Sequence, residues 1–186
     1  MVTLSPRSTA LVLIDLQQGI VPLASGQRSG EEVVAAAKTL AARFRAAGAP
    51  VVLVHVALTP GTMPSQLVDR PALPPGGTPP EWSELVPGLA EDGDIIVLKH
   101  HWGAFTGTDL DLQLRRRGID TVVIAGIATN MGVESTARSA WELSYHVVIA
   151  EDATASRSAE LHDFSVNKIL PQIARVVGCE EIGLGA

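Results

Sequence analysis

Three places in the sequence carry groups that could do chemistry. A carboxylate, Asp15, ends the apolar run TALVLID, and an ammonium, Lys99, ends the run DIIVLK. A third apolar run leads into ATNMG, residues 128–132, where a strand would turn into a helix. Each feature alone is common, because Asp often forms turns and Lys is usually solvated. Together at neighbouring strand ends they predict an ion pair in a cleft, where burial and mutual charge shift proton affinities.

The elements that would position these groups are short apolar runs rich in Val and Ile, at residues 9–15, 50–57, 94–99, 120–126 and 146–152. They do not alternate with polar residues, as expected of strands covered on both faces. Segments with helical periodicity lie at residues 30–48, 108–118, 130–144 and 158–178. This alternation predicts an α/β fold, a Rossmann-like three-layer α/β/α arrangement with a central, mostly parallel sheet of five to six strands. A weak last strand, EEIGL, would close an edge, and the length predicts a single domain, residues 1–186.

Ligands of such sheets bind beyond the carboxyl ends of the strands. The residues predicted to lie there are Asp15, 57–58, 99–101, 128–132 and Asp152. A segment crowded with Pro and Gly, residues 59–80, leaves the same edge and is longer than an ordinary connection. Its length and position favour a lid over a rigid surface excursion.

The amino-acid composition limits the classes of partner that the protein is expected to bind. The chain is 46% hydrophobic and 18% charged, with a formal net charge of −6, so a globular fold is predicted and nucleic-acid binding is not. Its one cysteine, Cys179, excludes an internal disulfide and fits a reducing compartment. No apolar stretch approaches the length of a membrane span, and the amino terminus does not resemble a signal peptide. We therefore expect a soluble, cytoplasmic protein that acts on a small molecule and has no membrane partner.

Cofactor motifs are not found in the sequence. His55 has no acidic neighbour, and His100 and His101 would point to opposite sides of an extended segment. Neither H-E-x-x-H nor a G-x-G-x-x-G after the first strand occurs. Neither a metal nor a dinucleotide is predicted.

Three segments carry a resemblance to a known family: LVLIDLQQG, VLKHHWGAFTGTDLDLQLRRRGIDTVVIAG and GIATNMGVESTARSAWELSYHVVIAEDATAS. Through them the chain resembles the isochorismatase-like hydrolases, a superfamily that includes nicotinamidases, N-carbamoylsarcosine amidases and other cysteine hydrolases. The resemblance implies an Asp-Lys-Cys triad, a cis peptide just before the nucleophile turn, here at Ile127–Ala128, and a homodimer or homotetramer. Asp15 and Lys99 match the triad. Gly132 stands where the cysteine is implied.

The glycine decides which chemistry is possible. Without a thiol no covalent intermediate forms, and deletion of a nucleophile commonly costs several orders of magnitude in rate. Cys179 is predicted at the far end of the last helix and cannot replace the thiol. Thr129, Ser135 and Thr136 are nearby hydroxyls, but none lies in a G-x-S-x-G turn and none has an evident His base.

One branch of the superfamily resembles this arrangement. The isochorismatases of phenazine and siderophore pathways are implied to carry Gly at this position and to cleave a vinyl ether, which needs an acid and no nucleophilic side chain. Asp15 would be the general acid, Lys99 would tune it or bind an anion, and Gly132 would leave room for the substrate. The N–H groups of Met131 and Gly132 would polarise the substrate.

Further residues are predicted to bind the substrate. Arg70 matches an arginine implied to bind substrate carboxylates, whereas Leu58 replaces an implied glutamine and Ala128 a bulkier aromatic residue. The full set of predicted substrate-binding residues is Gln17, Arg70, Trp82, Trp102, Ala128 and Met131. Two alternatives stay open: a non-catalytic descendant that binds a metabolite, and a cysteine amidase whose nucleophile has been mutated.

Overall fold

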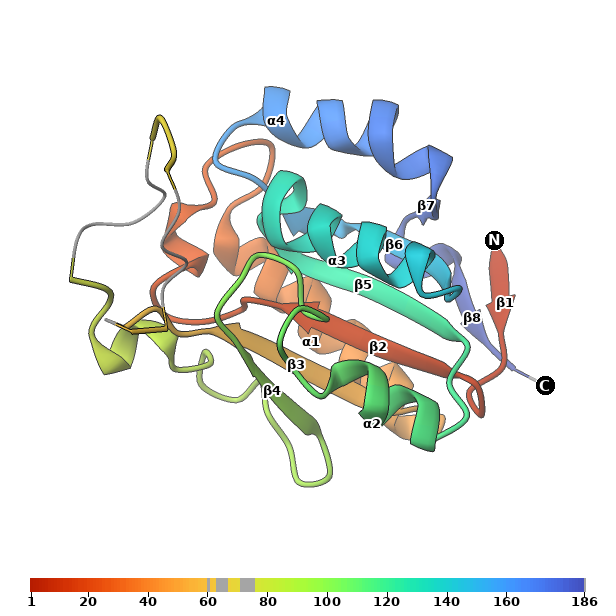
Figure 1. Ribbon diagram of the computed structural model, residues 1–186. Helices are drawn as coiled ribbons and strands as arrows, with labels where there is room; N and C mark the ends of the chain where they lie inside the picture. The colour runs from red at the N-terminus through yellow and green to blue at the C-terminus, as the bar shows by residue number, and fades with distance from the viewer. Residues whose placement is uncertain (60, 63–66, 71–75, 186) are drawn as a thin grey trace.

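The fold is built on one parallel sheet (Figure 1). The computed structural model describes residues 1–59, 61–62, 67–70 and 76–185. The sheet has the strand order β4-β3-β2-β5-β6-β7, and every neighbouring pair is parallel. Its strands are β2 (Thr9–Ile14), β3 (Val51–Val56), β4 (Ile95–Lys99), β5 (Thr121–Ile127), β6 (His146–Ala155) and β7 (Arg175–Val177). The predicted α/β class is confirmed, with six strands.

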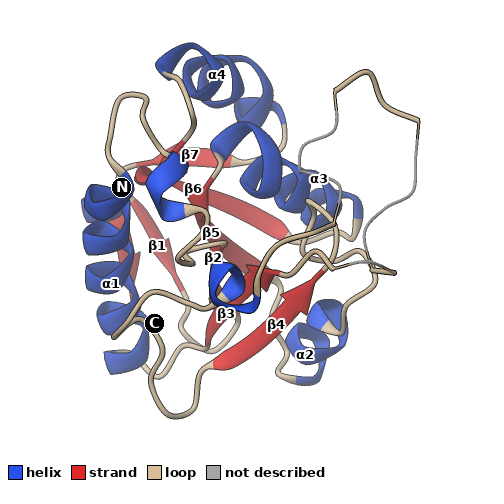
Figure 2. Cartoon of the chain, turned by 90° about the vertical axis from the view of Figure 1, so that its left-hand side faces the viewer, coloured by secondary structure: helices blue, strands red, loops and turns tan. Residues whose placement is uncertain are grey.

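Helices cover both faces of the sheet, as Figure 2 shows. One face is covered by α1 (Gly30–Ala46), and the other by α2 (Leu110–Arg116), α3 (Glu134–Glu142) and the segment that begins with α4 (Ala159–Phe164). All residues of β2 and β5 are buried, which explains their unbroken apolar sequences. A capping box between Ser29 and Glu32 fixes the start of α1.

The last predicted helix, residues 158–178, is confirmed as a helical segment only as far as Gln172 and is wrong beyond it. After α4 the chain continues through the π-helical turn η4 (Ser165–Ile169) and the 3-10 turn η5 (Leu170–Gln172), and then pairs with β6 as β7. Pro171 has no N–H to donate and does not extend a regular helix. Cys179 therefore follows a strand, and its backbone N–H donates to Asp152 Oδ1 at 2.8 Å.

Two other strand predictions need correction. The segment EEIGL contains β8 (Ile182–Leu184), which pairs with β1 (Val2–Leu4) in a separate two-stranded sheet and does not close the main one. Strand β6 runs on to Ala155 with a shift in register against β5. Asp152 consequently lies inside β6 and not at its carboxyl end.

The predicted lid, residues 59–80, includes residues 60, 63–66 and 71–75, which lie outside the described residues. Over the rest of the chain, no helix has the length and apolarity needed to cross a lipid bilayer.

Candidate active site

An ion pair lies at the carboxyl edge of the sheet. Asp15 directly follows β2 and Lys99 is the last residue of β4, so the lysine side chain reaches across β3. Lys99 Nζ donates to Asp15 Oδ2 at 2.8 Å and to the His101 carbonyl at 3.0 Å. Lys99 is 1% exposed and Asp15 is 5% exposed. The structure thus joins two side chains that are 84 positions apart.

Burial makes Asp15 a weak acid. Desolvation raises the pKa of its carboxyl from 3.8 to about 6, although the charge and hydrogen bond of Lys99 and the charge of His55 lower it. Its other oxygen, Oδ1, is buried without a hydrogen-bond partner in the described part of the chain. A carboxyl that is half protonated near pH 6 and keeps one oxygen unpaired can donate a proton to a bound molecule.

The backbone holds this carboxyl in a defined place. Asp15 has φ +53°, in the left-handed region that Asp tolerates better than most residues. Its N–H donates to the Val54 carbonyl at 2.8 Å, which continues the ladder between β2 and β3 by one residue. The acid is therefore anchored to the sheet.

The turn beside the acid is the π-helical turn η3 (Thr129–Val133), which directly follows β5 and Ala128. The Ile127–Ala128 peptide is cis, at the position that the resemblance implied. The N–H groups of Met131 and Val133 both donate to the Ala128 carbonyl, at 3.1 and 3.2 Å. The Met131 N–H is therefore used inside the turn, which corrects the expectation that it polarises a substrate.

Gly132 brings the turn close to the acid. A Cβ atom there would lie 2.9 Å from Ile14 Cγ2 and 3.1 Å from Asp15 Oδ2. The glycine does not have a positive φ, so its backbone does not require glycine. Ile14 and Asp15 partly fill the space that a side chain would take, and glycine permits this close approach.

Gln17 is not placed as a substrate-binding residue. Its Nε2 donates to the carbonyls of Val56 and Trp82 at 3.0 and 2.9 Å, and its Oε1 accepts from the Val56 N–H at 2.8 Å. The side chain is fully buried. Because both of its amide protons are bound to backbone, Gln17 fastens the segment after β2 to β3 and to the 3-10 turn η2 (Pro80–Ser83).

The remaining predicted contacts are less enclosed. The Trp82 indole packs on Gly19 so closely that a Cβ there would lie 2.0 Å from it, whereas the Trp102 side chain is exposed. Trp102 nevertheless approaches the turn, because its carbonyl oxygen lies 3.6 Å from the Cβ position of Gly132. Arg70 is exposed and lies next to residues outside the described ones. Ala128 is half-buried, and the substrate-binding roles of these residues stay predictions.

The sequence reasoning missed one group of polar residues at the turn. Thr129 Oγ1 lies 2.9 Å from His162 Nδ1, and His162 Nε2 lies 2.9 Å from Glu151 Oε1. For Thr129, this corrects the inference that the hydroxyls near the turn have no histidine partner. No sequence motif could reveal it, because 33 positions separate Thr129 from His162 and α4 brings them together only through tertiary packing.

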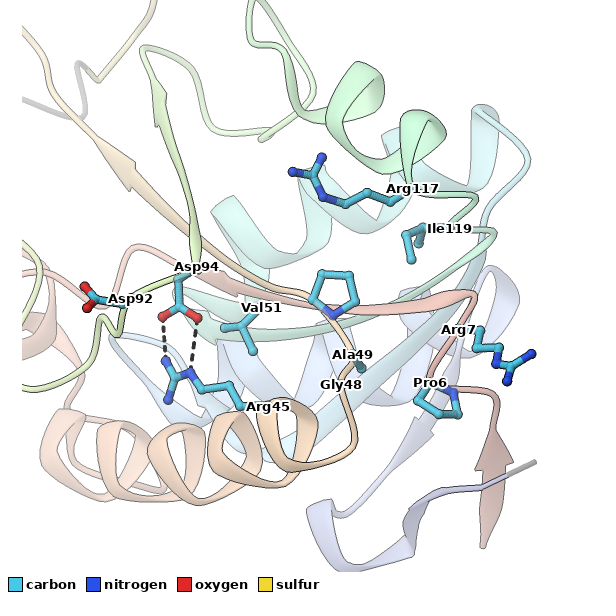
Figure 3. A pocket seen from close by; sticks show the side chains of 12 residues that line it. Pro6, Arg7, Arg45, Gly48, Ala49, Val51, Asp92, Asp94, Arg117 and Ile119 are labelled. Carbon is cyan, nitrogen blue, oxygen red and sulfur yellow. Dashed lines mark hydrogen bonds and ion pairs between the residues drawn. The ribbon is translucent and has the colours of Figure 1, made fainter.

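A hollow of about 500 Å³ lies at the opposite edge of the sheet (Figure 3). Its lining comes from segments just before strands, including Arg7, Asp94 and Ile119. Arg45 Nη2 and Nε bind the Asp94 carboxylate at 2.6 and 3.1 Å, so these charges are paired with each other. Because ligands of parallel sheets bind at the carboxyl ends, this hollow is not the active site.

In the part of the chain that the structure describes, no group of three or more His, Cys, Asp and Glu residues could hold a metal ion.

The fold and the site define a class of protein: a three-layer α/β protein with a buried carboxylate–ammonium pair at its strand ends. The isochorismatase domain matches residues 9–181, and the chain belongs to the isochorismatase family of hydrolases. It is 54% identical over 185 residues to the isochorismatase family protein YecD of Escherichia coli O157:H7, with 98% of each chain covered.

Two further comparisons agree. A solved structure of an isochorismatase family protein from Burkholderia thailandensis is similar at a TM-score of 0.92 and 46% identity, covering 97% of this chain and 95% of that one. The ureidoacrylate amidohydrolase RutB of Enterobacter sp. (strain 638) is 34% identical over 191 residues, covering 86% of this chain and 80% of the relative. The family thus includes amide hydrolysis among its reactions.

Proposed function

We propose that the protein hydrolyses a vinyl ether of a small carboxylated cyclic metabolite by acid catalysis, with Asp15 as the general acid. The observation that carries this proposal is the Asp15 carboxyl: it is buried, Oδ1 has no partner among the described residues, and its pKa is raised to about 6. The absence of a side chain at Gly132 supports a reaction without a covalent intermediate.

The reaction follows from the chemistry of an enol ether. Protonated Asp15 gives its proton to the terminal enol carbon, and the ether oxygen stabilises the oxocarbenium that forms. Water adds to this cation and loses a proton, and the resulting hemiketal breaks its bond to the ring oxygen to give pyruvate and a ring alcohol. Lys99, 2.8 Å from Oδ2, stabilises the carboxylate left behind until it is protonated again.

The pH dependence tests this proposal. We expect release of pyruvate from isochorismate with a kcat/KM that falls about tenfold for each pH unit above the Asp15 pKa of about 6, since only the protonated form reacts. The measurement is a pyruvate assay from pH 5 to pH 9, corrected for the rate without enzyme. A kcat/KM that rises through pH 6 would show that Asp15 acts ionised, as a base, and would overturn the acid mechanism. Absence of pyruvate at every pH would instead favour a non-catalytic metabolite-binding protein.

One observation favours amide hydrolysis as a second candidate function. A Cβ atom on residue 132 would lie 3.1 Å from Asp15 Oδ2, so a thiol there would be within reach of that carboxylate. The 34% identical relative is a ureidoacrylate amidohydrolase. In that case the glycine stands in place of a nucleophile.

The Gly132→Cys variant tests the second candidate. We expect it to gain hydrolysis of a small amide such as ureidoacrylate, because Asp15 can take the thiol proton. Gly132→Ala is the matched control, since it adds the same Cβ without sulfur and should gain nothing. Equal rates for the two variants would show that the turn does not support a covalent route.

The sequence expectations of a cytoplasmic location and of a homodimer or homotetramer remain proposals. Light scattering on the purified protein measures the second.

A further inference from the structure

A chain of polar side chains fastens the η3 turn to the rest of the protein. It runs from Thr129 Oγ1 to His162 Nδ1 at 2.9 Å, and from His162 Nε2 to Glu151 Oε1 at 2.9 Å. Glu151 is then held by both terminal nitrogens of Arg28, at 2.9 and 3.1 Å. These residues come from the turn, α4, β6 and the loop before α1. The row of hydrogen bonds therefore connects four separate segments of the protein.

The contact with Glu151 fixes the role of one ring nitrogen of His162. The hydrogen bond from His162, followed by those from Arg28, lowers the pKa of Glu151 to about 2, so this carboxylate accepts hydrogen bonds and donates none. Nε2 must then carry the proton that faces Glu151. The other ring nitrogen, Nδ1, is thereby held toward the Thr129 hydroxyl.

Burial makes this bond important for the turn. Thr129 and His162 are 0% and 1% exposed, so water does not replace a lost partner easily. Thr129 is the first residue of η3, and Gly132, three positions later, lies against Asp15 Oδ2. A displacement of Thr129 would therefore also displace Gly132 relative to the Asp15 carboxyl.

We propose that His162 is a positioning residue: held in one orientation by Glu151, it binds Thr129 and keeps the η3 turn against Asp15. This inference rests on the proposed function, because it concerns the same site. Thr129 itself is fully buried, so its hydroxyl is not accessible to a substrate and does not act as a nucleophile.

Two substitutions of His162 distinguish the roles of its two ring nitrogens. The side chain of His162→Asn places a polar atom near the position of Nδ1 and can keep the bond to Thr129. That of His162→Gln places one near Nε2, so it can keep the bond to Glu151 but not the bond to Thr129. Each variant loses part of the ring and one buried hydrogen bond, so both are expected to unfold at a lower temperature than the wild type. Thr129→Val removes the hydroxyl that bonds to His162, whereas Thr129→Ser keeps that hydroxyl and can keep the bond.

The experiment measures kcat, KM and amide hydrogen exchange on the purified variants. We expect His162→Gln and Thr129→Val to lower kcat on isochorismate by roughly 10- to 100-fold, the range for small misplacements of a site, with little change in KM. His162→Asn and Thr129→Ser should lose much less. Exchange at residues 129–133 should rise in the first pair and stay near the wild-type rate in the second. Arg43→Met is the stability control, because it removes hydrogen bonds to the carbonyls of Cys179 and Ile182, outside this site.

The outcomes distinguish this proposal from the proposed function. If no variant and no wild-type protein turns over isochorismate, the exchange pattern still tests the role of His162. Equal exchange and equal kcat in the Asn and Gln variants would overturn the positioning role and leave a general contribution to stability. A covalent adduct on Thr129, detected by mass spectrometry during turnover, would overturn it in favour of a nucleophilic threonine.

Discussion

Replacement of Asp15 by Asn is expected to lower kcat for vinyl-ether hydrolysis by about 10³-fold or more, near the upper part of the range for loss of a general acid. Asn has the same shape, yet its amide cannot give a proton to the enol carbon. Asp15 is 5% exposed, and the pKa of its carboxyl is about 6. The measurement is kcat at pH 6, per folded molecule, at a temperature well below the unfolding transition of the variant.

The substitution also leaves Lys99 without its buried counter-ion, so a loss of stability has to be separated from a loss of chemistry. Asp94→Asn provides the matched control. The Asp94 side chain is only 4% exposed, and it pairs with Arg45 at the opposite edge of the sheet (Figure 3). We expect this control to lose stability and keep kcat. Retention of more than a tenth of the wild-type kcat by Asp15→Asn would contradict the acid role.

The contact between Asp15 and Lys99 could be anticipated because its cause is topological. Strands covered on both faces have unbroken apolar sequences, and parallel strands end at one edge of the sheet. Once residues 9–15 and 94–99 are read as strands, a carboxylate and an ammonium at their ends face the same region. The distance along the chain then matters little.

Other features depend on packing that has no local signature. Strands β1 and β7 have three residues each, too few for a periodic pattern, and β7 lies in a stretch that also reads as helix. The bond between Thr129 and His162 depends on how α4 lies against η3. The role of Gln17 is similar: its sequence position suggests a substrate contact, and only the three-dimensional structure shows that its amide binds the backbone at Val56 and Trp82.

Replacement of Lys99 by Met should change both stability and the pH profile. Lys99 is 1% exposed and bonded to Asp15, and removal of one partner of a buried ion pair typically costs about 3–5 kcal/mol. Methionine fills much of the lysine volume, so the main loss is the charge. We expect a cost of that size in the free energy of unfolding at pH 8, measured by chemical denaturation.

The cost should shrink as the pH falls. Lys99 lowers the pKa of Asp15, so without it that pKa lies above the wild-type value of about 6. A carboxyl whose pKa is raised in the folded state binds its proton more tightly there than in the unfolded chain, where the pKa is 3.8. Stability is therefore lost as the pH rises from about 4 through the folded pKa. The variant should lie closer to the wild type at pH 5 than at pH 8.

The higher pKa of Asp15 in Lys99→Met also distinguishes an acid from a base in the kinetics. If Asp15 donates a proton, its protonated form persists to higher pH in Lys99→Met, and the decline of kcat/KM should begin above pH 6. If Asp15 acts as a base, the rising limb moves to higher pH and activity near neutrality is lost. Lys38→Met is the matched control, since Lys38 binds the Pro87 carbonyl and does not contact Asp15. A pH profile that does not move in Lys99→Met would show that the limb belongs to another group, because Lys99 is the ammonium bonded to Asp15.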